Sequence, residues 1–408
     1  SGRRLELAVS SVVLKTLQLR RSIVSTWQKV EWGGAEGGKQ VVNFRSPETA
    51  VSDSTDGAFP VGSESDTDLI IQLPSVKSTH KNNTSSSKGT TLRGASPVSK
   101  DEELREEMNW EEKLTRAIYA ANNGSRTVFV IRGNVRLTKP LPWIQENARF
   151  SIRGSCGPDR KCVIDGASKY PIFVSYASGC SLSVVDLELR NAKGGAAYMK
   201  SCSVEVRSCI FRKNEGDYGA AIFMGLGTQT FDISDSMFID NKALLGDGGA
   251  LFLSTRGKGR ITNCTFDGNR AKNRGGAVKY HSSNEAFVCS ATTFRSNVAG
   301  TGGGAMWISP TASDVADVFF MGCDFSNNKA LTGNGGAIGL ETQLTGHFCG
   351  TTYTSNQARE GDDVELVQDG GLPIHLYFCP VRPEGLHVTP DPKAVAVADT
   401  CAYCVAPS

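Results

Sequence analysis

Four basic side chains are the residues of this chain best placed to bind a ligand, because they fall in loops that recur about every 28 residues. They are Lys242, Arg270, Arg274 and Lys329. Cations at corresponding positions of stacked loops would form a basic stripe, and such a stripe attracts an anionic glycan. Ordinary solvated turns are the alternative interpretation. The partner that this pattern predicts is a glycan or a cell-surface protein.

Acidic side chains offer two further kinds of chemistry. Asp217 and Asp247 could give Ca²⁺ the oxygen ligands it prefers, although no calcium-loop consensus surrounds them. The pair Asp362–Asp363 has the two carboxylates that glycoside hydrolysis needs, but no histidine lies nearby and a degenerate last repeat is the simpler interpretation. Histidine metal motifs and phosphate-binding loops are absent from the sequence. We therefore predict no catalytic residue, no metal site and no cofactor, with calcium as the one weak candidate.

The twelve cysteines all lie between Cys156 and Cys404, and this density favours an oxidising compartment. Cys156 and Cys162, in the sequence CGPDRKC, are predicted to close a short disulfide loop. Cys401 and Cys404 are further disulfide candidates in a small C-terminal cap, because the C-terminal spacing fits no standard zinc pattern. Three other cysteines occur as Cys-x-Phe and are predicted to be small buried apolar residues: Cys209, Cys264 and Cys323.

An internal repeat must position these residues. Phe-x-x-Asn recurs at spacings of 27, 28, 28 and 31 residues, and Tyr353–Asn356 follows 28 residues later as an aromatic variant. A small-residue box, usually Gly-Gly-Ala followed by an apolar residue, comes after each Asn. The aromatic members are Phe211, Phe238, Phe266, Phe294 and Phe325, and the amide members are Asn214, Asn241, Asn269, Asn297 and Asn328.

A period near 28 without helical patterning predicts a coil of β-strands with one rung per repeat. Successive rungs would pair in parallel about 4.8 Å apart. We expect the Phe to stack inside, the Asn to occupy one corner in a left-handed or turn conformation, and the Gly pairs to permit turns and close rung contact. Alternate residues after each box are apolar, as in a strand with one buried face.

The rest of the chain divides by composition. Residues 1–32 are a possible amphipathic or targeting segment, and residues 33–100 form a low-complexity linker expected to be disordered. A capping helix is predicted over 101–124, with Asp101 as its N-cap. The β-helix is assigned to 125–378, which at about 28 residues per rung makes roughly nine rungs. Residues 379–408 are a Cys-containing cap or the start of a further module.

Charge and motifs limit the function class. The formal net charge of +2 argues against nucleic acid as a partner. No apolar run is long enough for a transmembrane helix. Four Asn-x-Ser/Thr triplets, at Asn82, Asn83, Asn123 and Asn263, are compatible with a glycoprotein. Together with the cysteines, these features predict an extracellular or cell-surface location.

The paired motifs GGA[ILV] and FxxN resemble the repeats of the chlamydial polymorphic outer membrane proteins, within the pectate-lyase-like superfold. The resemblance spans roughly 191–366 and implies a right-handed parallel β-helix displayed at a surface and linked to adhesion. We therefore expect a non-enzymatic protein that adheres to a glycan or a protein. Two alternatives stay open: a polysaccharide lyase or hydrolase of the same superfold, and a structural spacer in a larger extracellular protein.

Overall fold

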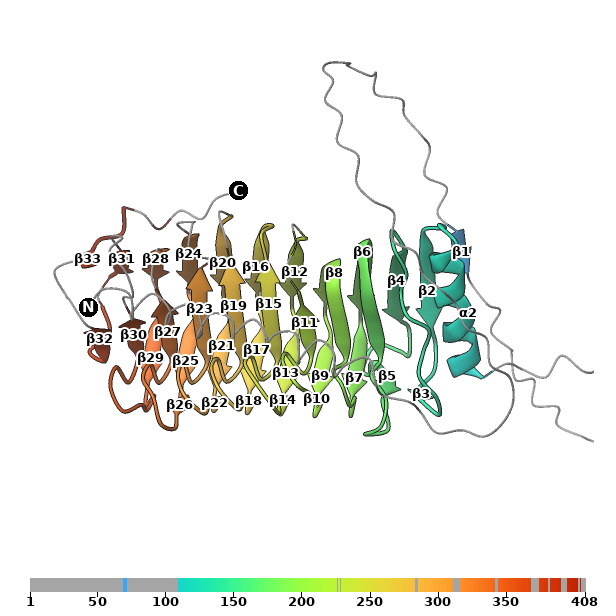
Figure 1. Ribbon diagram of the computed structural model, residues 1–408, viewed down its shortest axis with the longest axis horizontal. Coiled ribbons are helices and arrows are strands. Elements are labelled where there is room, and N and C mark those ends of the chain that lie inside the picture. The colour runs from blue at the N-terminus through green and yellow to red at the C-terminus, as the bar shows by residue number, and fades with distance from the viewer. Residues whose placement is uncertain are drawn as a thin grey trace, which may run out of the picture. The chain divides into compact units, whose positions relative to one another are not determined.

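The computed structural model describes residues 69–71, 109–225, 227, 229–282, 285–310, 316–341, 344–367, 374–380, 382–389, 395–402 and 404. These residues form a right-handed parallel β-helix of about eight turns, with one α-helix at the end where the coil begins (Figure 1). The predicted architecture is confirmed, and the coil has about eight turns where the repeat predicts roughly nine rungs. Residues 1–68 and 72–108, including Asp101, Asn82 and Asn83, lie outside the described residues.

Three sheets run along the coil axis, and every strand pairing in them is parallel. The largest sheet bends into two faces, because β6 and β8 each extend across both, whereas later rungs divide this length into two strands.

The first face begins with the first halves of β6 (Phe173–Val185) and β8 (Ala197–Arg207) and continues through β11 (Ile222–Met224), β15 (Leu251–Thr255), β19 (Val278–Ser282), β23 (Met306–Pro310), β27 (Ile338–Glu341), β30 (Val364–Val367) and β32 (Leu386–Thr389). The second face begins with β1 (Leu69–Ile71), β2 (Thr127–Ile131), β4 (Arg149–Gly154) and the second halves of β6 and β8. It continues through β12 (Phe231–Ser234), β16 (Gly259–Thr262), β20 (Phe287–Ser290), β24 (Ala316–Met321), β28 (Leu344–Cys349), β31 (Ile374–Cys379) and β33 (Val395–Asp399).

The nine-stranded sheet contains β3 (Val135–Arg136), β5 (Cys162–Asp165), β7 (Leu187–Arg190), β9 (Ile210–Arg212), β13 (Met237–Ile239), β17 (Thr265–Asp267), β21 (Thr293–Arg295), β25 (Asp324–Ser326) and β29 (Thr352–Thr354). The five-stranded sheet contains β10 (Glu215–Gly216), β14 (Lys242–Ala243), β18 (Arg270–Ala271), β22 (Val298–Ala299) and β26 (Lys329–Ala330).

The repeated Phe form an aromatic stack along the interior. Each pairs in register with the Phe of the next rung, and all five side chains have no exposed surface. Their nearly parallel rings have centroids 4.6–5.1 Å apart, and Tyr353 continues the stack 5.6 Å beyond Phe325. The stack therefore gives the coil a continuous apolar core, as the repeat predicts.

The repeated Asn form a hydrogen-bonded ladder beside this stack. The Oδ1 of Asn269 accepts from both the backbone N–H and the Nδ2 of Asn241, each at 3.0 Å. The Nδ2 of Asn269 donates to the carbonyl of Phe238 at 2.9 Å and to the Oδ1 of Asn297 at 3.0 Å. Every polar atom of this buried amide thus has a partner, as burial of a polar group requires.

The left-handed conformation expected for the ladder Asn falls instead on the residue before each one. Lys213, Asp240 and Ser296 have φ of 52°, 53° and 55°, and Gly268 occupies the matching position. The bend comes one residue earlier because the Asn side chain points into the core. Asp240 and Gly268 are residue types that tolerate the left-handed conformation, whereas Lys213 and Ser296 adopt it without that preference.

The two glycines of each box serve different purposes. Gly275 has φ of +66°, which lets the chain turn into β19. A Cβ on Gly276 would stand 2.0 Å from the carbonyl oxygen of Gly304 on the next rung. The first glycine therefore permits the turn and the second permits the close approach of rungs.

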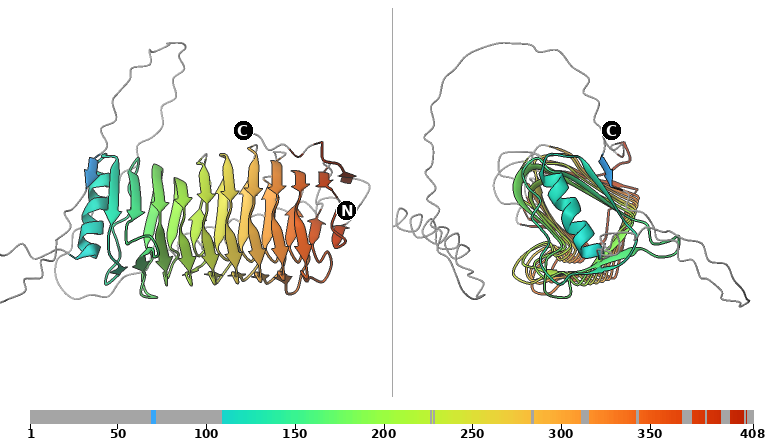
Figure 2. Two further views of the ribbon diagram at one scale, coloured as in Figure 1. Left: turned by 180° about the vertical axis from the view of Figure 1, so that it is seen from behind. Right: turned by 90° about the vertical axis from the view of Figure 1, so that its right-hand side faces the viewer.

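The helix α2 (Trp110–Asn122) lies across the open end of the coil (Figure 2, right). Its N-cap is Asn109, whose Oδ1 accepts from the N–H of Glu112 at 3.0 Å. The predicted cap at Asp101 is therefore wrong for this helix, which begins at Trp110. Its apolar side faces the core, as the spacing of Leu114, Ile118 and Ala121 predicts. The helix covers the sheet edge that the first rung leaves open.

The parallel pairing continues past the predicted boundary at residue 378. Strand β32 pairs with β30, and β33 pairs with β31, so the sheet extends to Asp399. At the other end, β1 pairs with β2, which places a short strand inside the segment predicted to be a linker. These terminal strands lack the repeated motifs of the central rungs. The few apolar residues in each strand nevertheless suffice for parallel pairing.

The buried ladder gives a stability prediction. Replacing Asn269 with Ala removes four hydrogen bonds and leaves the amide of Asn241 and the carbonyl of Phe238 without these partners. We expect a loss of about 3–5 kcal/mol in the free energy of unfolding, measured by urea denaturation. Lys242→Ala, on an exposed neighbouring site, should change it by less than about 0.5 kcal/mol. Equal stability of both variants would contradict a ladder that fixes the rungs.

Candidate binding faces

Three of the four predicted basic residues do share a line on the coil surface. The register of the five-stranded sheet aligns Lys242 with Arg270, and Val298 with Lys329, so the three exposed cations follow one column with Val298 between them. Before Lys242 the column continues through Glu215 to Lys193, and after Lys329 it continues to Gln357. The stripe is therefore real but short, with only two adjacent cations.

Arg274 does not lie on this stripe. Its guanidinium stands 4.4 Å from the ring centroid of Trp307 and forms an ion pair with Glu341, on the outer side of the first face. The prediction that it belongs with the other three cations is wrong, because Arg274 stands immediately before the glycine turn into β19. Its side chain reaches along the coil to later rungs.

The acidic candidates also have structural partners. Asp247 Oδ1 accepts the backbone N–H of Arg274 at 3.0 Å, while the carbonyl of Asp217 accepts from two backbone N–H groups. Asp363 Oδ1 accepts from the Nδ2 of Asn356 and so ends the Asn ladder, and Asp362 accepts from the N–H of Ala358. In the part of the chain that the structure describes, no three His, Cys, Asp or Glu side chains gather as metal ligands.

An aromatic row marks the outer side of the first face. Tyr198, Phe223 and Phe252 are in register on β8, β11 and β15, with ring centroids 4.5 and 5.1 Å apart and nearly parallel planes. Tyr176 packs on Tyr198 at 5.2 Å. We call these four residues, with the flanking Trp143 and Tyr218, the aromatic row.

The ends of the aromatic row are its most exposed parts. Trp143 is 56% exposed, Tyr176 54% and Tyr218 43%, whereas the rings between them are half-buried. Trp143 meets Tyr176, and Tyr218 meets Phe252, edge to face. Because the central rings stack on one another, the row presents ring edges in its middle and tilted rings at its ends.

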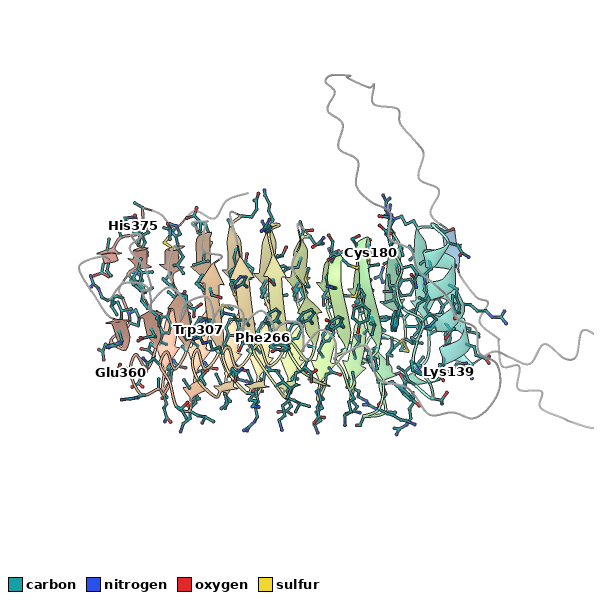
Figure 3. The ribbon with its side chains drawn as sticks, in the orientation of Figure 1. Lys139, Cys180, Phe266, Trp307, Glu360 and His375 are labelled. Atoms are coloured by element: carbon teal, nitrogen blue, oxygen red, sulfur yellow. A yellow bond between two sulfur atoms is a disulfide. The ribbon has the colours of Figure 1, made fainter. Side chains whose placement is uncertain are left out.

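A polar cluster continues the same column on the next rungs. Phe252 is followed in register by Lys279 and then by Trp307, which Figure 3 labels among the strands of the first face. The adjacent outer column places His281 beside Ser309. Lys279 Nζ donates to the Oγ of Ser309 at 2.5 Å, and His281 Nδ1 lies 3.0 Å from the same oxygen.

Packing explains why this polar cluster is buried. The ring of Trp307 lies over Gly339, where a Cβ would stand 2.1 Å from the ring, and Arg274 covers its other side. Lys279 is only 6% exposed. Burial lowers its pKa to about 8, an effect that the charge of Arg274 increases and those of Glu341 and Asp247 oppose. Burial, and then the charge of Lys279, also lowers the pKa of His281.

His281 belongs to no histidine motif of the sequence, yet it is half-buried and in contact with Ser309. The sequence contains a signal for the whole column, because each of its residues directly follows a four-residue small-residue box. These residues are Tyr198, Phe223, Phe252, Lys279 and Trp307. These positions face outward, so the apolar alternation that predicts the strands carries no information about them.

The cysteines separate into bonded and buried groups. Cys156–Cys162, Cys180–Cys202, Cys349–Cys404 and Cys379–Cys401 are disulfides, so Cys401 and Cys404 each bond to an earlier strand. Cys209, Cys264, Cys289 and Cys323 are free and buried. Burial raises the pKa of Cys209 and of Cys264 to about 12, which keeps these thiols protonated and inert as packing groups.

Two family descriptions match the chain. Residues 143–313 match the right handed beta helix region, and residues 322–341 match the Chlamydia polymorphic membrane protein repeat. The chain is a right-handed β-helix with a chlamydial-type repeat. No curated protein and no solved structure matches it. The repeat is associated with outer-membrane and surface proteins, and the disulfides of this β-helix agree with an extracellular setting.

The described residues of the β-helix contain no helix that is both long and apolar enough to span a membrane. Of the potential glycosylation sites in this part, Asn123 and Asn263 are exposed. The Nδ2 of Asn263 donates to Asp235 at 2.7 Å. Whether either asparagine carries a glycan stays a prediction from the sequence motif.

The buried Lys279 leads to a prediction of pH dependence. The pKa of Lys279 is about 8 in the folded protein and near 10.5 when exposed. Between these two pH values the side chain is protonated in the unfolded chain but mostly unprotonated in the folded protein. This group therefore makes the stability of the wild type rise with pH in that range. Lys279→Met should abolish that rise. At pH 7 it should also be more stable than wild type by on the order of 1–3 kcal/mol, because no charge is buried.

The measurement is urea unfolding of both proteins between pH 7 and 10. The stabilising effect of Lys279→Met should shrink steadily as the pH increases. Lys242→Met, on the exposed stripe, provides the control and should show no such change. A constant difference between wild type and Lys279→Met across this range would contradict a lowered pKa.

Proposed function

We propose that this protein is a non-enzymatic surface or extracellular adhesion protein, and that its aromatic row binds a protein partner. The observation that carries the proposal is the group of exposed Trp143, Tyr176 and Tyr218 around three half-buried rings. Tyrosine, tryptophan and phenylalanine are the residues enriched at the centres of protein interfaces.

The geometry of the row favours a protein over a sugar in this role. The central rings are stacked 4.5–5.1 Å apart, so their faces are already covered by one another and their edges form an apolar ridge. A sugar ring needs an exposed aromatic face, whereas apolar side chains of a protein can pack along such a ridge. Because Tyr176, Tyr198, Phe223 and Phe252 lie on paired strands, this part of the row is held rigidly and loses little entropy on binding.

Adhesion to cultured cells tests the proposal. Beads coated with the wild-type chain should bind, and a triple variant with Trp143→Ser, Tyr176→Ser and Tyr218→Ser should bind at least about tenfold less, as expected for loss of interface anchors. All three side chains are exposed, so the fold should persist, and circular dichroism checks this. A matched control carries Leu245→Ser and Leu331→Ser, which are exposed apolar residues outside the row.

Treatment of the cells identifies the class of the receptor. Trypsin applied to the cells should remove binding to wild-type beads if the partner is a protein. Binding that survives trypsin, or a triple variant that binds as well as wild type, would overturn the proposal. A protein that binds under no condition would instead favour the structural spacer.

One observation favours the alternative of a polysaccharide lyase. Lys279 has a pKa of about 8, so part of it is uncharged near neutral pH, and it stands beside Ser309 and His281 on the outer side of the first face. An uncharged lysine can act as the general base that removes the proton next to a uronate carboxylate. The cluster therefore has the residue types that such an elimination needs.

The lyase alternative predicts turnover that depends on Lys279. Incubation with polyuronates and with sulfated polysaccharides should then release unsaturated ends, detected by their ultraviolet absorbance. Lys279→Met should reduce the rate by at least about a hundredfold, as for loss of a general base. Sustained turnover that Lys279→Met abolishes would replace the non-enzymatic proposal, and absence of product with each substrate would leave it standing.

A further inference from the structure

A pocket of about 720 Å³ lies where the early rungs meet the disulfide loop Cys156–Cys162. Its walls come from β2, β4 and this loop, together with Asp186 and Ile210. It uses none of the aromatic row's residues. The volume falls in the range of pockets that hold small ligands.

The lining of the pocket is predominantly cationic. Arg132, Arg153, Arg160 and Lys161 provide four positive charges, against two negative charges from Asp159 and Asp186, which leaves a formal charge of +2 on the pocket. The whole chain also has a formal net charge of +2, so the pocket has a higher positive charge per residue than the chain as a whole. A hollow of one sign of charge focuses its field on an anion inside it.

Asp186 organises two of these cations. One carboxylate oxygen lies 3.5 Å from Arg153 Nε and the other lies 3.7 Å from Lys161 Nζ. Asp186 can come this close because Gly154 has no side chain, and a Cβ there would stand 2.1 Å from the carbonyl oxygen of Asp186. Asp186 thus contacts both Arg153 and Lys161 and holds these two cations on either side of its carboxylate.

The disulfide loop holds Arg160 in place. The bond between Cys156 and Cys162 closes the segment that carries Arg160 and Lys161, and Arg160 Nε donates to the carbonyl of Cys156 at 3.1 Å. Gly157, with φ of +117°, allows the tight turn at the start of the loop. A loop closed in this way has less conformational freedom to lose when it binds a ligand.

We propose that this pocket binds a sulfated segment of a polysaccharide. Several cations in one lining suit several sulfate groups on one chain, and the apolar side chains of Val130 and Ile210 suit the carbon–hydrogen face of a sugar ring. A single inorganic anion would occupy only a small part of this volume. The site is separate from the aromatic row, so it goes beyond the proposed protein adhesion and does not depend on it.

Isothermal titration of the full chain tests the pocket. The probes are a fully sulfated heparin tetrasaccharide, the same tetrasaccharide without sulfate, and inorganic sulfate. We expect the sulfated tetrasaccharide to bind and the desulfated one to bind at least about tenfold more weakly, since charge-assisted contacts supply the affinity. Inorganic sulfate that binds as tightly as the tetrasaccharide would overturn the proposal and leave only a simple anion site.

Two matched variants locate the binding. Arg160→Ser with Lys161→Ser removes two cations from the pocket and should weaken binding at least about tenfold. Lys242→Ser with Arg270→Ser removes two cations from the basic stripe and should change affinity less than about twofold. Equal weakening by both variants would overturn the proposal, because it would show attraction by net charge alone.

A third variant raises affinity and so does not rely on loss of function. Asp159→Asn removes an exposed acid from the pocket lining and should strengthen binding of the sulfated tetrasaccharide by about two- to fivefold at low salt. Unchanged affinity in Asp159→Asn would count against the pocket. Cell adhesion through the aromatic row would be unaffected by either result.

Discussion

The buried asparagine ladder is the interaction on which the rest of this structure depends. Each side chain links the rung before it to the rung after it, through the amide of one Asn and the carbonyl of a Phe. A buried amide with an unmet hydrogen bond is costly, so a rung cannot slide along its neighbour without breaking several bonds. Every other alignment, inside and outside, follows from this fixed register.

The outward columns use the same register for a different purpose. Because strand positions alternate between the interior and the surface, the residue next to each buried apolar position must face outward. The aromatic row and the Lys279 cluster are therefore spaced by the ladder, although neither contributes to it. Surface residues can vary along the coil while the interior stays constant.

Much of the fold was readable from the sequence, because its interior repeats. The Phe stack, the glycine turns and the disulfide Cys156–Cys162 follow from residues whose spacing or type leaves few alternatives. The binding faces were harder to predict, since they are made by residues that do not repeat. Arg274 shows the reason: its position in the loop suggests the basic stripe, but a ring on the next rung and an acid beyond it attract its side chain elsewhere.

The two ends of the ladder have a consequence for how such a coil can change in length. It starts where Asn214 accepts from the backbone N–H of Ala192 and stops where Asn356 donates to Asp363. Between these points each Asn meets only the neighbouring rungs. Duplication or deletion of one whole repeat would therefore leave every internal bond intact, and would lengthen or shorten the outer columns by one residue each.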